Sequence, residues 1–197
     1  LLVYCLNIKM NLQMLYKIVS FYIFLLVAFS CKSPEARRPV QQSSGTFIQE
    51  SAQRNKALYD EEKEHIQKII DADTTKDYIA SDSGFWYYYN TKDSIVEPKP
   101  KLGDDVTFTY DVKELSGKTI LSKEETGLQR YKVDQTNQDL ISGIRDGIKL
   151  MQEGETITFI FPSYKAFGYY GIESKLGTNI PIKSTVTLKT IKQNQEN

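Results

Sequence analysis

The chain has 197 residues, with 25 basic and 25 acidic side chains and a single histidine. The formal net charge of zero argues against nucleic acid as a partner, because binding a phosphate backbone requires an excess of basic side chains. The two cysteines are Cys5 and Cys31, so no disulfide can form within the chain after residue 31, and the apolar core must hold the fold.

An apolar run over residues 18–29 follows a basic side chain near the N-terminus. The run is too short to span a bilayer comfortably, and the pattern is typical of a secretory signal peptide, predicted here over residues 10–30. Residues 1–9 precede Met10, the plausible start, and we expect them to be untranslated. The run ends at Cys31, and a polar segment follows; this resembles a bacterial lipobox and implies that Cys31 is lipidated. An ordinary cleaved signal or a single membrane anchor is the alternative.

Residues 31–46 are rich in Pro, Gln and Ser and predict a flexible tether. Over residues 47–77 the composition changes to Glu, Gln, Lys and Ala with sparse apolar positions, which predicts a mostly solvated helix. This helix could be a spacer or a pairing element between two copies, and its thin apolar stripe favours the spacer. His65 has no second histidine or cysteine nearby, which favours a surface side chain over a metal ligand. The sequence leaves the oligomeric state open.

The globular part is predicted over residues 78–192, with a tail at 193–197. Alternating or aromatic-rich runs predict strands, and turn residues such as Ser116-Gly117 separate them. The strands are expected at residues 85–90, 106–112, 120–121, 156–161 and 185–191. One segment, residues 140–151, has the apolar spacing of a helix. This order predicts an α+β fold in which an antiparallel sheet wraps over one short α-helix.

The most specific motif runs from Leu140 to Gly171 and reads LISGIRDGIKLMQEGETITFIFPSYKAFGYYG. A helix leads into a strand through Gly154, the strand runs into Pro162 and an aromatic, glycine-punctuated loop, and the chain closes with Ile180-Pro181 and an alternating strand. This succession resembles the FKBP-type peptidyl-prolyl cis-trans isomerases. Together with the lipobox, it is most similar to the gliding-motility-associated FKBP-type lipoproteins of Bacteroidetes.

The resemblance implies an isomerase of X-Pro segments in exported proteins, anchored to the membrane and facing the periplasm. No metal or cofactor is expected, because twisting an amide needs apolar, water-poor walls and a few hydrogen-bond donors rather than a nucleophile. The positions that match the family's catalytic residues are Tyr110, Ile141 and Phe167. The positions that match its substrate-binding walls are Ile120, Tyr131, Leu140, Ile144, Ile180 and Leu188. The aliphatic positions among them are also compatible with a purely structural role in the core.

Three positions depart from the family pattern. Ile144 stands where most members carry tryptophan, Phe167 where they carry a tyrosine hydroxyl, and Leu121 where they carry aspartate. These departures imply weaker catalysis without loss of binding to an apolar X-Pro segment. A non-catalytic, proline-segment-binding chaperone module is therefore the alternative function. A third possibility is a structural envelope lipoprotein whose cleft is filled by Tyr169 or Tyr170.

Overall fold

The computed structural model describes residues 15–17, 20, 44–92, 97–135 and 139–194. The chain divides into two units, Leu1–Gly45 and Thr46–Asn197. In the first unit, residues 15–17 and 20 are helical. Cys31 and most of the predicted signal peptide and tether lie outside the described residues. The helices that are described include none long and apolar enough to cross a membrane.

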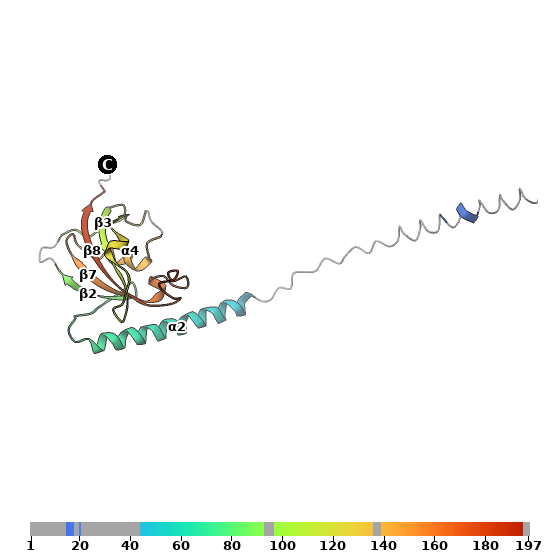
Figure 1. Ribbon diagram of the computed structural model, residues 1–197, viewed down its shortest axis with the longest axis horizontal. Coiled ribbons are helices and arrows are strands. Elements are labelled where there is room, and N and C mark those ends of the chain that lie inside the picture. The colour runs from blue at the N-terminus through green and yellow to red at the C-terminus, as the bar shows by residue number, and fades with distance from the viewer. Residues whose placement is uncertain (1–14, 18–19, 21–43, 93–96, 136–138, 195–197) are drawn as a thin grey trace, which may run out of the picture. The chain divides into compact units, whose positions relative to one another are not determined.

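Helix α2, Ser44–Ala72, leads into the second unit (Figure 1). It begins three residues before the predicted boundary and ends before residue 77, because a turn follows in which the Asp73 carboxylate accepts a hydrogen bond from the Thr75 N–H at 3.0 Å. The composition of this segment predicts a mostly solvated helix. Two of its side chains are nevertheless buried, those of Glu62 and Ile66, so one face of α2 is packed.

The strands are β1 Ile79–Ser81, β2 Phe85–Thr91, β3 Asp105–Tyr110, β4 Val112–Glu114, β5 Thr119–Leu121, β6 Gln129–Lys132, β7 Thr156–Phe161 and β8 Ile182–Lys192. Within the described residues they form one eight-stranded antiparallel sheet in the order β1-β2-β7-β8-β3-β6, with β4 paired to β5 and β8. The long strands arise from the runs that alternate in the sequence, because every second side chain of a strand points to the same face. The sheet and the helix described below confirm the predicted α+β fold.

One predicted strand is divided in two. Alternation over residues 106–112 predicts a continuous strand, but β3 ends at Tyr110 and β4 begins two residues later. Asp111 between them is buried; its carboxylate accepts a hydrogen bond from the Thr185 N–H at 2.8 Å, and its carbonyl accepts one from the Ser184 hydroxyl at 2.6 Å. These bonds hold the break against β8. The predicted hairpin with β5 is consequently made by β4 and not by β3.

Strand β1 and three further short elements go beyond the sequence prediction. Helix α3, Lys123–Thr126, begins with a capping box in which Ser122 and Glu125 each accept a hydrogen bond from the other's backbone N–H. Strand β6 follows it and pairs with β3. A single 3₁₀ turn, η1 Ser163–Lys165, follows β7.

Helix α4, Ser142–Ile148, confirms the predicted short helix and packs against the sheet (Figure 1). Gly143 and Gly147 lie one turn apart on the face toward β7. A Cβ atom at Gly143 would lie 2.5 Å from the Phe161 ring, and one at Gly147 would lie 2.9 Å from the Phe159 ring. Such distances are shorter than a van der Waals contact, so only glycine lets α4 approach the sheet this closely.

Candidate active site

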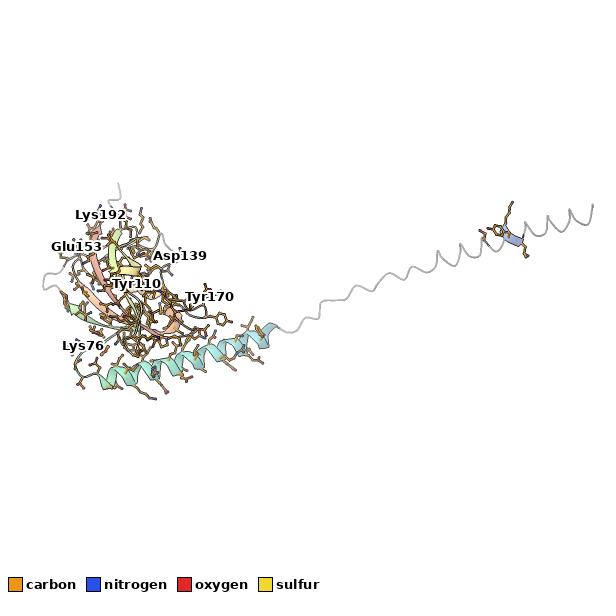
Figure 2. All side chains as sticks on the ribbon, in the orientation of Figure 1. Lys76, Tyr110, Asp139, Glu153, Tyr170 and Lys192 are labelled. Carbon is orange, nitrogen blue, oxygen red and sulfur yellow. The ribbon has the colours of Figure 1, made fainter. Side chains whose placement is uncertain are left out.

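Tyr110 ends β3 at the edge of the apolar core, half-buried (Figure 2). Its ring centroid lies 6.0 Å from that of the buried Phe108. The Thr126 hydroxyl donates a hydrogen bond to the Tyr110 carbonyl at 2.6 Å, which ties the end of β3 to α3. Burial raises the pKa of the Tyr110 phenol. The hydroxyl is therefore protonated at neutral pH and able to donate a hydrogen bond.

Tyr131 comes from β6 and is almost fully buried. Its hydroxyl accepts a hydrogen bond from the Asp134 N–H at 2.9 Å. Burial is the largest cause that raises the pKa of the Tyr131 phenol, with the nearby Asp134 carboxylate acting in the same direction. Because the hydroxyl is engaged with its own turn, Tyr131 can offer a substrate only its ring.

Helix α4 and the residues before it supply the aliphatic side of the site. Leu140 and Ile141 directly precede the helix, with Ile141 at its N-cap, and Ile144 lies in its first turn, fully buried. Ile120 from β5 is buried, and Leu188 from β8 is fully buried. The backbone N–H groups at the start of a helix have no partner within it, so this end of α4 can present donors to a ligand.

Phe167 lies in the loop that follows η1 and is half-buried against the core. The carbonyl of Ser163 accepts hydrogen bonds from the Ala166 N–H at 3.0 Å and from the Gly168 N–H at 2.9 Å. Phe167 stands between these two donors, so a single carbonyl holds the backbone on both sides of it.

The two tyrosines after Phe167 are exposed. Tyr169 is 74% exposed, and Tyr170, which is labelled in Figure 2, is 91% exposed. Their rings contact each other with centroids 5.9 Å apart. Neither side chain packs into the core, so the arrangement expected of a cleft filled by its own tyrosines is absent from this loop.

Eight of the nine predicted site residues are part of the apolar core of the domain or pack against it, and they come from β3, β5, β6, β8, α4 with the residues before it, and the loop after β7. They are Tyr110, Ile120, Tyr131, Leu140, Ile141, Ile144, Phe167 and Leu188. The ninth, Ile180, is 38% exposed and lies outside this core. It lines a separate cavity of about 440 Å³ together with Leu176, Pro181 and His65. Leu121, one of the departures from the family pattern, packs half-buried against the core.

Residues 97–190 match the model of the family described as FKBP-type peptidyl-prolyl cis-trans isomerase. The matched region, slightly less than half of the chain, is an FKBP-type domain. The activity that the family's description names is the cis-trans isomerisation of peptidyl-prolyl bonds. The predicted family and enzyme class are confirmed.

Two solved structures have a similar FKBP-like fold. The peptidyl-prolyl cis-trans isomerase from Pseudomonas syringae pv. tomato DC3000 is 21% identical, with a TM-score of 0.53 over 70% of this chain and 96% of that chain. FkpA from Escherichia coli is 19% identical, with a TM-score of 0.54 over 96% of this chain and 94% of that chain. A comparison with curated proteins gave no match.

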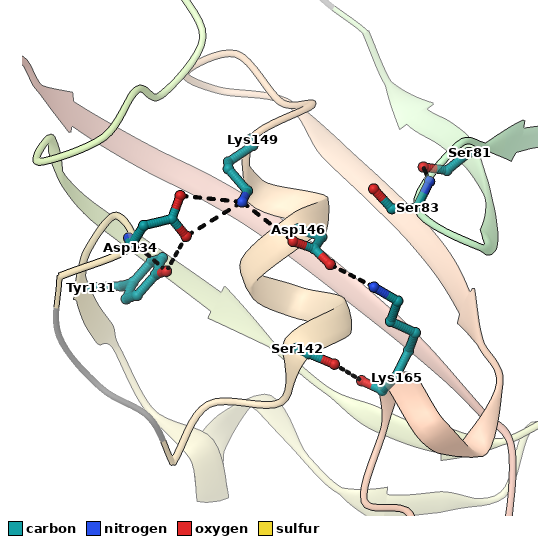
Figure 3. Close-up of polar contacts among 8 residues, drawn as sticks. All are labelled: Ser81, Ser83, Tyr131, Asp134, Ser142, Asp146, Lys149 and Lys165. Carbon is teal, nitrogen blue, oxygen red and sulfur yellow. Dashed lines mark hydrogen bonds and ion pairs between the residues drawn. The ribbon is translucent and has the colours of Figure 1, made fainter. Parts of the chain in front are cut away.

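A chain of polar contacts joins three elements that carry candidate site residues or lie next to them (Figure 3). The Nζ atom of Lys165 lies 2.8 Å from the Asp146 carboxylate. The Nζ atom of Lys149 lies 3.3 Å from Asp146 and 3.3 Å from Asp134. Since the N–H of Asp134 also donates to Tyr131 at 2.9 Å, these contacts connect β6, α4 and the loop after β7.

In this chain of contacts, the partners of Asp146 and Lys149 shift the pKa of each so that its charged form is favoured. Burial alone would raise the pKa of Asp146, but the hydrogen bonds and charges of Lys165 and Lys149 outweigh it and hold that pKa below its usual value. Burial would lower the pKa of Lys149, and its contacts with Asp134 and Asp146 raise it overall. In the sequence only the Asp146–Lys149 spacing of three along a helix is visible. The other partners come from separate elements, so sequence reasoning missed them.

Proposed function

We propose that this domain isomerises X-Pro bonds of exported envelope proteins, with catalysis by desolvation and stabilisation of the twisted amide. The observation that carries the proposal is the convergence of Tyr110, Tyr131, Ile141 and Phe167 from four separate elements on the apolar core. Tyr110 and Phe167 are only half-buried, so an incoming peptide can reach this side of the core. X-Pro segments are accordingly the proposed substrate.

The chemistry needs no covalent step. Rotation about an X-Pro bond has a barrier of about 18–20 kcal/mol because planarity preserves amide resonance. At the transition state the amide has lost its charge separation, so an apolar, water-poor wall favours it over the polar planar form. A thousandfold acceleration requires only about 4 kcal/mol of such preference. In this proposal the protonated Tyr110 hydroxyl and the N–H groups at the start of α4 hold the substrate carbonyl, while Ile141, Phe167 and the ring of Tyr131 exclude water.

A protease-coupled assay with proline-containing peptides tests this proposal. We expect the unmodified protein to accelerate isomerisation and Phe167→Asp to lose at least about tenfold in kcat/KM, because a charge in the apolar wall restores water to the site. Tyr170→Asp is the matched control, since it places the same charge on a fully exposed side chain of the same loop. Equal rates for the two variants would refute the proposed wall.

The second candidate is a non-catalytic module that binds proline segments. It is favoured by Phe167, which has no hydroxyl to donate, and by Ile144, which is fully buried where a large flat side chain is usual in the family. The same assay separates the two functions. Retained peptide binding with no acceleration at micromolar protein would favour the binding module.

The proposed place of action is the bacterial envelope, with the chain anchored through a lipidated Cys31 and facing the periplasm. The support is the lipobox-like sequence, and the resemblance to gliding-motility-associated lipoproteins points to motility or other exported proteins as clients. Cys31→Ser is expected to abolish lipid labelling in cells and to release the protein from the membrane fraction. Proteins that co-purify with the unmodified chain but not with Phe167→Asp are the expected clients.

A further inference from the structure

Glu62 is a buried carboxylate on helix α2, only 6% exposed. It accepts a hydrogen bond from the Ser163 N–H at 2.8 Å and another from the Ser163 hydroxyl at 2.6 Å. These partners lie 101 residues apart in the sequence. A carboxylate withdrawn from water is costly unless its oxygens are satisfied, and hydrogen bonds to an ionised acceptor are stronger than neutral ones. Glu62 therefore makes a specific contact with η1.

The contact around Glu62 extends over about two turns of α2. Ile66, four residues further on, is fully buried. Tyr59, three residues earlier, has its ring centroid 4.7 Å from that of Tyr164. The hydroxyl of Tyr164 in turn donates to the Gly84 carbonyl at 3.0 Å. Positions 59, 62 and 66 share one helix face. Through Tyr59 and Glu62, this face of α2 contacts η1.

Ser163 connects Glu62 with the loop that carries Phe167 in the candidate active site. Its N–H and hydroxyl bind Glu62, while its carbonyl accepts the N–H groups of Ala166 and Gly168 on either side of Phe167. The Gly168 carbonyl then accepts the Asn179 N–H at 2.8 Å. A series of hydrogen bonds thus runs from α2 through Ser163 to the backbone on either side of Phe167, and from Gly168 on to Asn179, the residue before Ile180.

We propose that Glu62 is a positioning residue of the isomerase, and that helix α2 is a working part of the catalytic domain as well as a spacer. The proposal rests on the proposed function of the Phe167 wall. Without the carboxylate, the Ser163 N–H and hydroxyl lose their acceptor in a buried place, so the turn must shift to find water. Catalysis by an apolar wall requires that the wall lie against the substrate. A small displacement of the residues that position it therefore lowers the rate of isomerisation strongly.

The test compares Glu62→Ala, Glu62→Gln and Ser163→Ala with Glu64→Ala, an exposed glutamate on the same helix. Two quantities are measured, kcat/KM for a proline peptide and the hydrogen-exchange rate of the Gly168 amide. We expect Glu62→Ala to lower kcat/KM about tenfold, mainly through kcat, and to speed Gly168 exchange. Glu62→Gln keeps one acceptor oxygen and should recover part of the rate. Glu64→Ala should match the unmodified protein.

Coupling between the partners gives a further criterion. If Glu62 acts through Ser163, the double variant Glu62→Ala/Ser163→Ala should be little worse than Glu62→Ala alone. Additive losses would overturn the proposed route, and kcat/KM within about twofold of the unmodified value in a folded Glu62→Ala protein would overturn the positioning role. If Glu62→Ala does not fold, Ser163→Ala carries the test, with an expected loss of about threefold for one neutral hydrogen-bond partner.

Failure of the proposed isomerase function can be distinguished from failure of the positioning role of Glu62. If the isomerase function fails, the unmodified protein itself does not accelerate isomerisation. In that event the same variants are compared in their affinity for the proline peptide. The positioning role predicts the same order of loss in affinity, with Glu62→Ala the weakest of the single variants and Glu64→Ala unchanged. Equal affinities across the set, together with equal Gly168 exchange rates, would overturn it.

Discussion

The Nζ atom of Lys165 lies 2.8 Å from the carboxylate of Asp146, so the loop that carries Phe167 is joined directly to helix α4. The hydroxyl of Ser142 at the start of α4 also donates to the Lys165 carbonyl at 3.3 Å. Two walls of the candidate site are therefore connected by contacts that involve none of the apolar site residues. This arrangement allows the apolar wall and its polar support to be tested independently.

Asp146→Asn should weaken the joint with Lys165. Both side chains are partly exposed, so we expect a loss of at most about 1 kcal/mol in the free energy of unfolding at neutral pH, and less at high salt. The folded-state pKa of Asp146 is lowered, so its stabilising effect is present above the ordinary aspartate pKa and is lost as pH falls through the folded value. Chemical denaturation at several pH values measures this.

The control for Asp146 is Asp82→Asn, an exposed aspartate in the turn between β1 and β2. The difference in unfolding free energy between the unmodified protein and Asp146→Asn should be constant near neutral pH and shrink in acid below about pH 4. A difference that grew in acid would contradict the assigned ion pair.

Gly143→Ala should destabilise the domain, because the new methyl group would lie 2.5 Å from the Phe161 ring and α4 would have to move away from the sheet. We expect a cost of about 1–3 kcal/mol in the free energy of unfolding, measured with denaturant. Gly177→Ala is the matched control, since its methyl group would meet only Ile180 at 3.7 Å. Equal stabilities of the two variants would contradict the close approach of α4.

Phe167→Tyr should raise kcat/KM for proline peptides. The half-buried ring lies in the candidate wall, and an added hydroxyl would supply the side-chain donor that the family pattern places here. One neutral hydrogen bond contributes about 0.5–1.5 kcal/mol, so the expected gain is about two- to tenfold. The protease-coupled assay measures this gain. Tyr170→Phe is the control, because it removes a hydroxyl from an exposed side chain of the same loop and should leave kcat/KM unchanged. A lower kcat/KM in Phe167→Tyr would place the end of this ring away from the substrate carbonyl.

Tyr131→Phe should separate stability from catalysis. The hydroxyl of Tyr131 accepts the Asp134 N–H at 2.9 Å, and its loss should cost about 1 kcal/mol in the free energy of unfolding. The ring is retained, so kcat/KM should stay within about twofold, whereas Tyr131→Ala should lower it strongly. A large loss of activity in a folded Tyr131→Phe protein would assign the hydroxyl a direct role and refute a wall made by the ring alone.

Periodicity along the chain predicted a helix within residues 140–151, where α4 spans Ser142–Ile148, and the strands β7 and β8; an aromatic-rich run predicted β2. Both signals are local, because side chains recur on one face every three to four residues in a helix and every two in a strand. The family resemblance supplied nine candidate site residues, of which six lie in the buried core and two, Tyr110 and Phe167, pack against it. Ile180 lies outside this core and lines a cavity together with Leu176 and Pro181.

By itself, then, the amino-acid sequence predicted the fold class and the order of the long elements. Only the tertiary structure decided how polar groups are paired. Asp111 divides a strand because its hydrogen-bond partners lie on β8, 73 and 74 residues away. Glu62 joins α2 to η1 through Ser163, a hydrogen-bond partner that lies 101 residues away in the sequence. Hydrogen bonds between distant residues depend on how the whole chain is brought together, and no spacing within one segment records them.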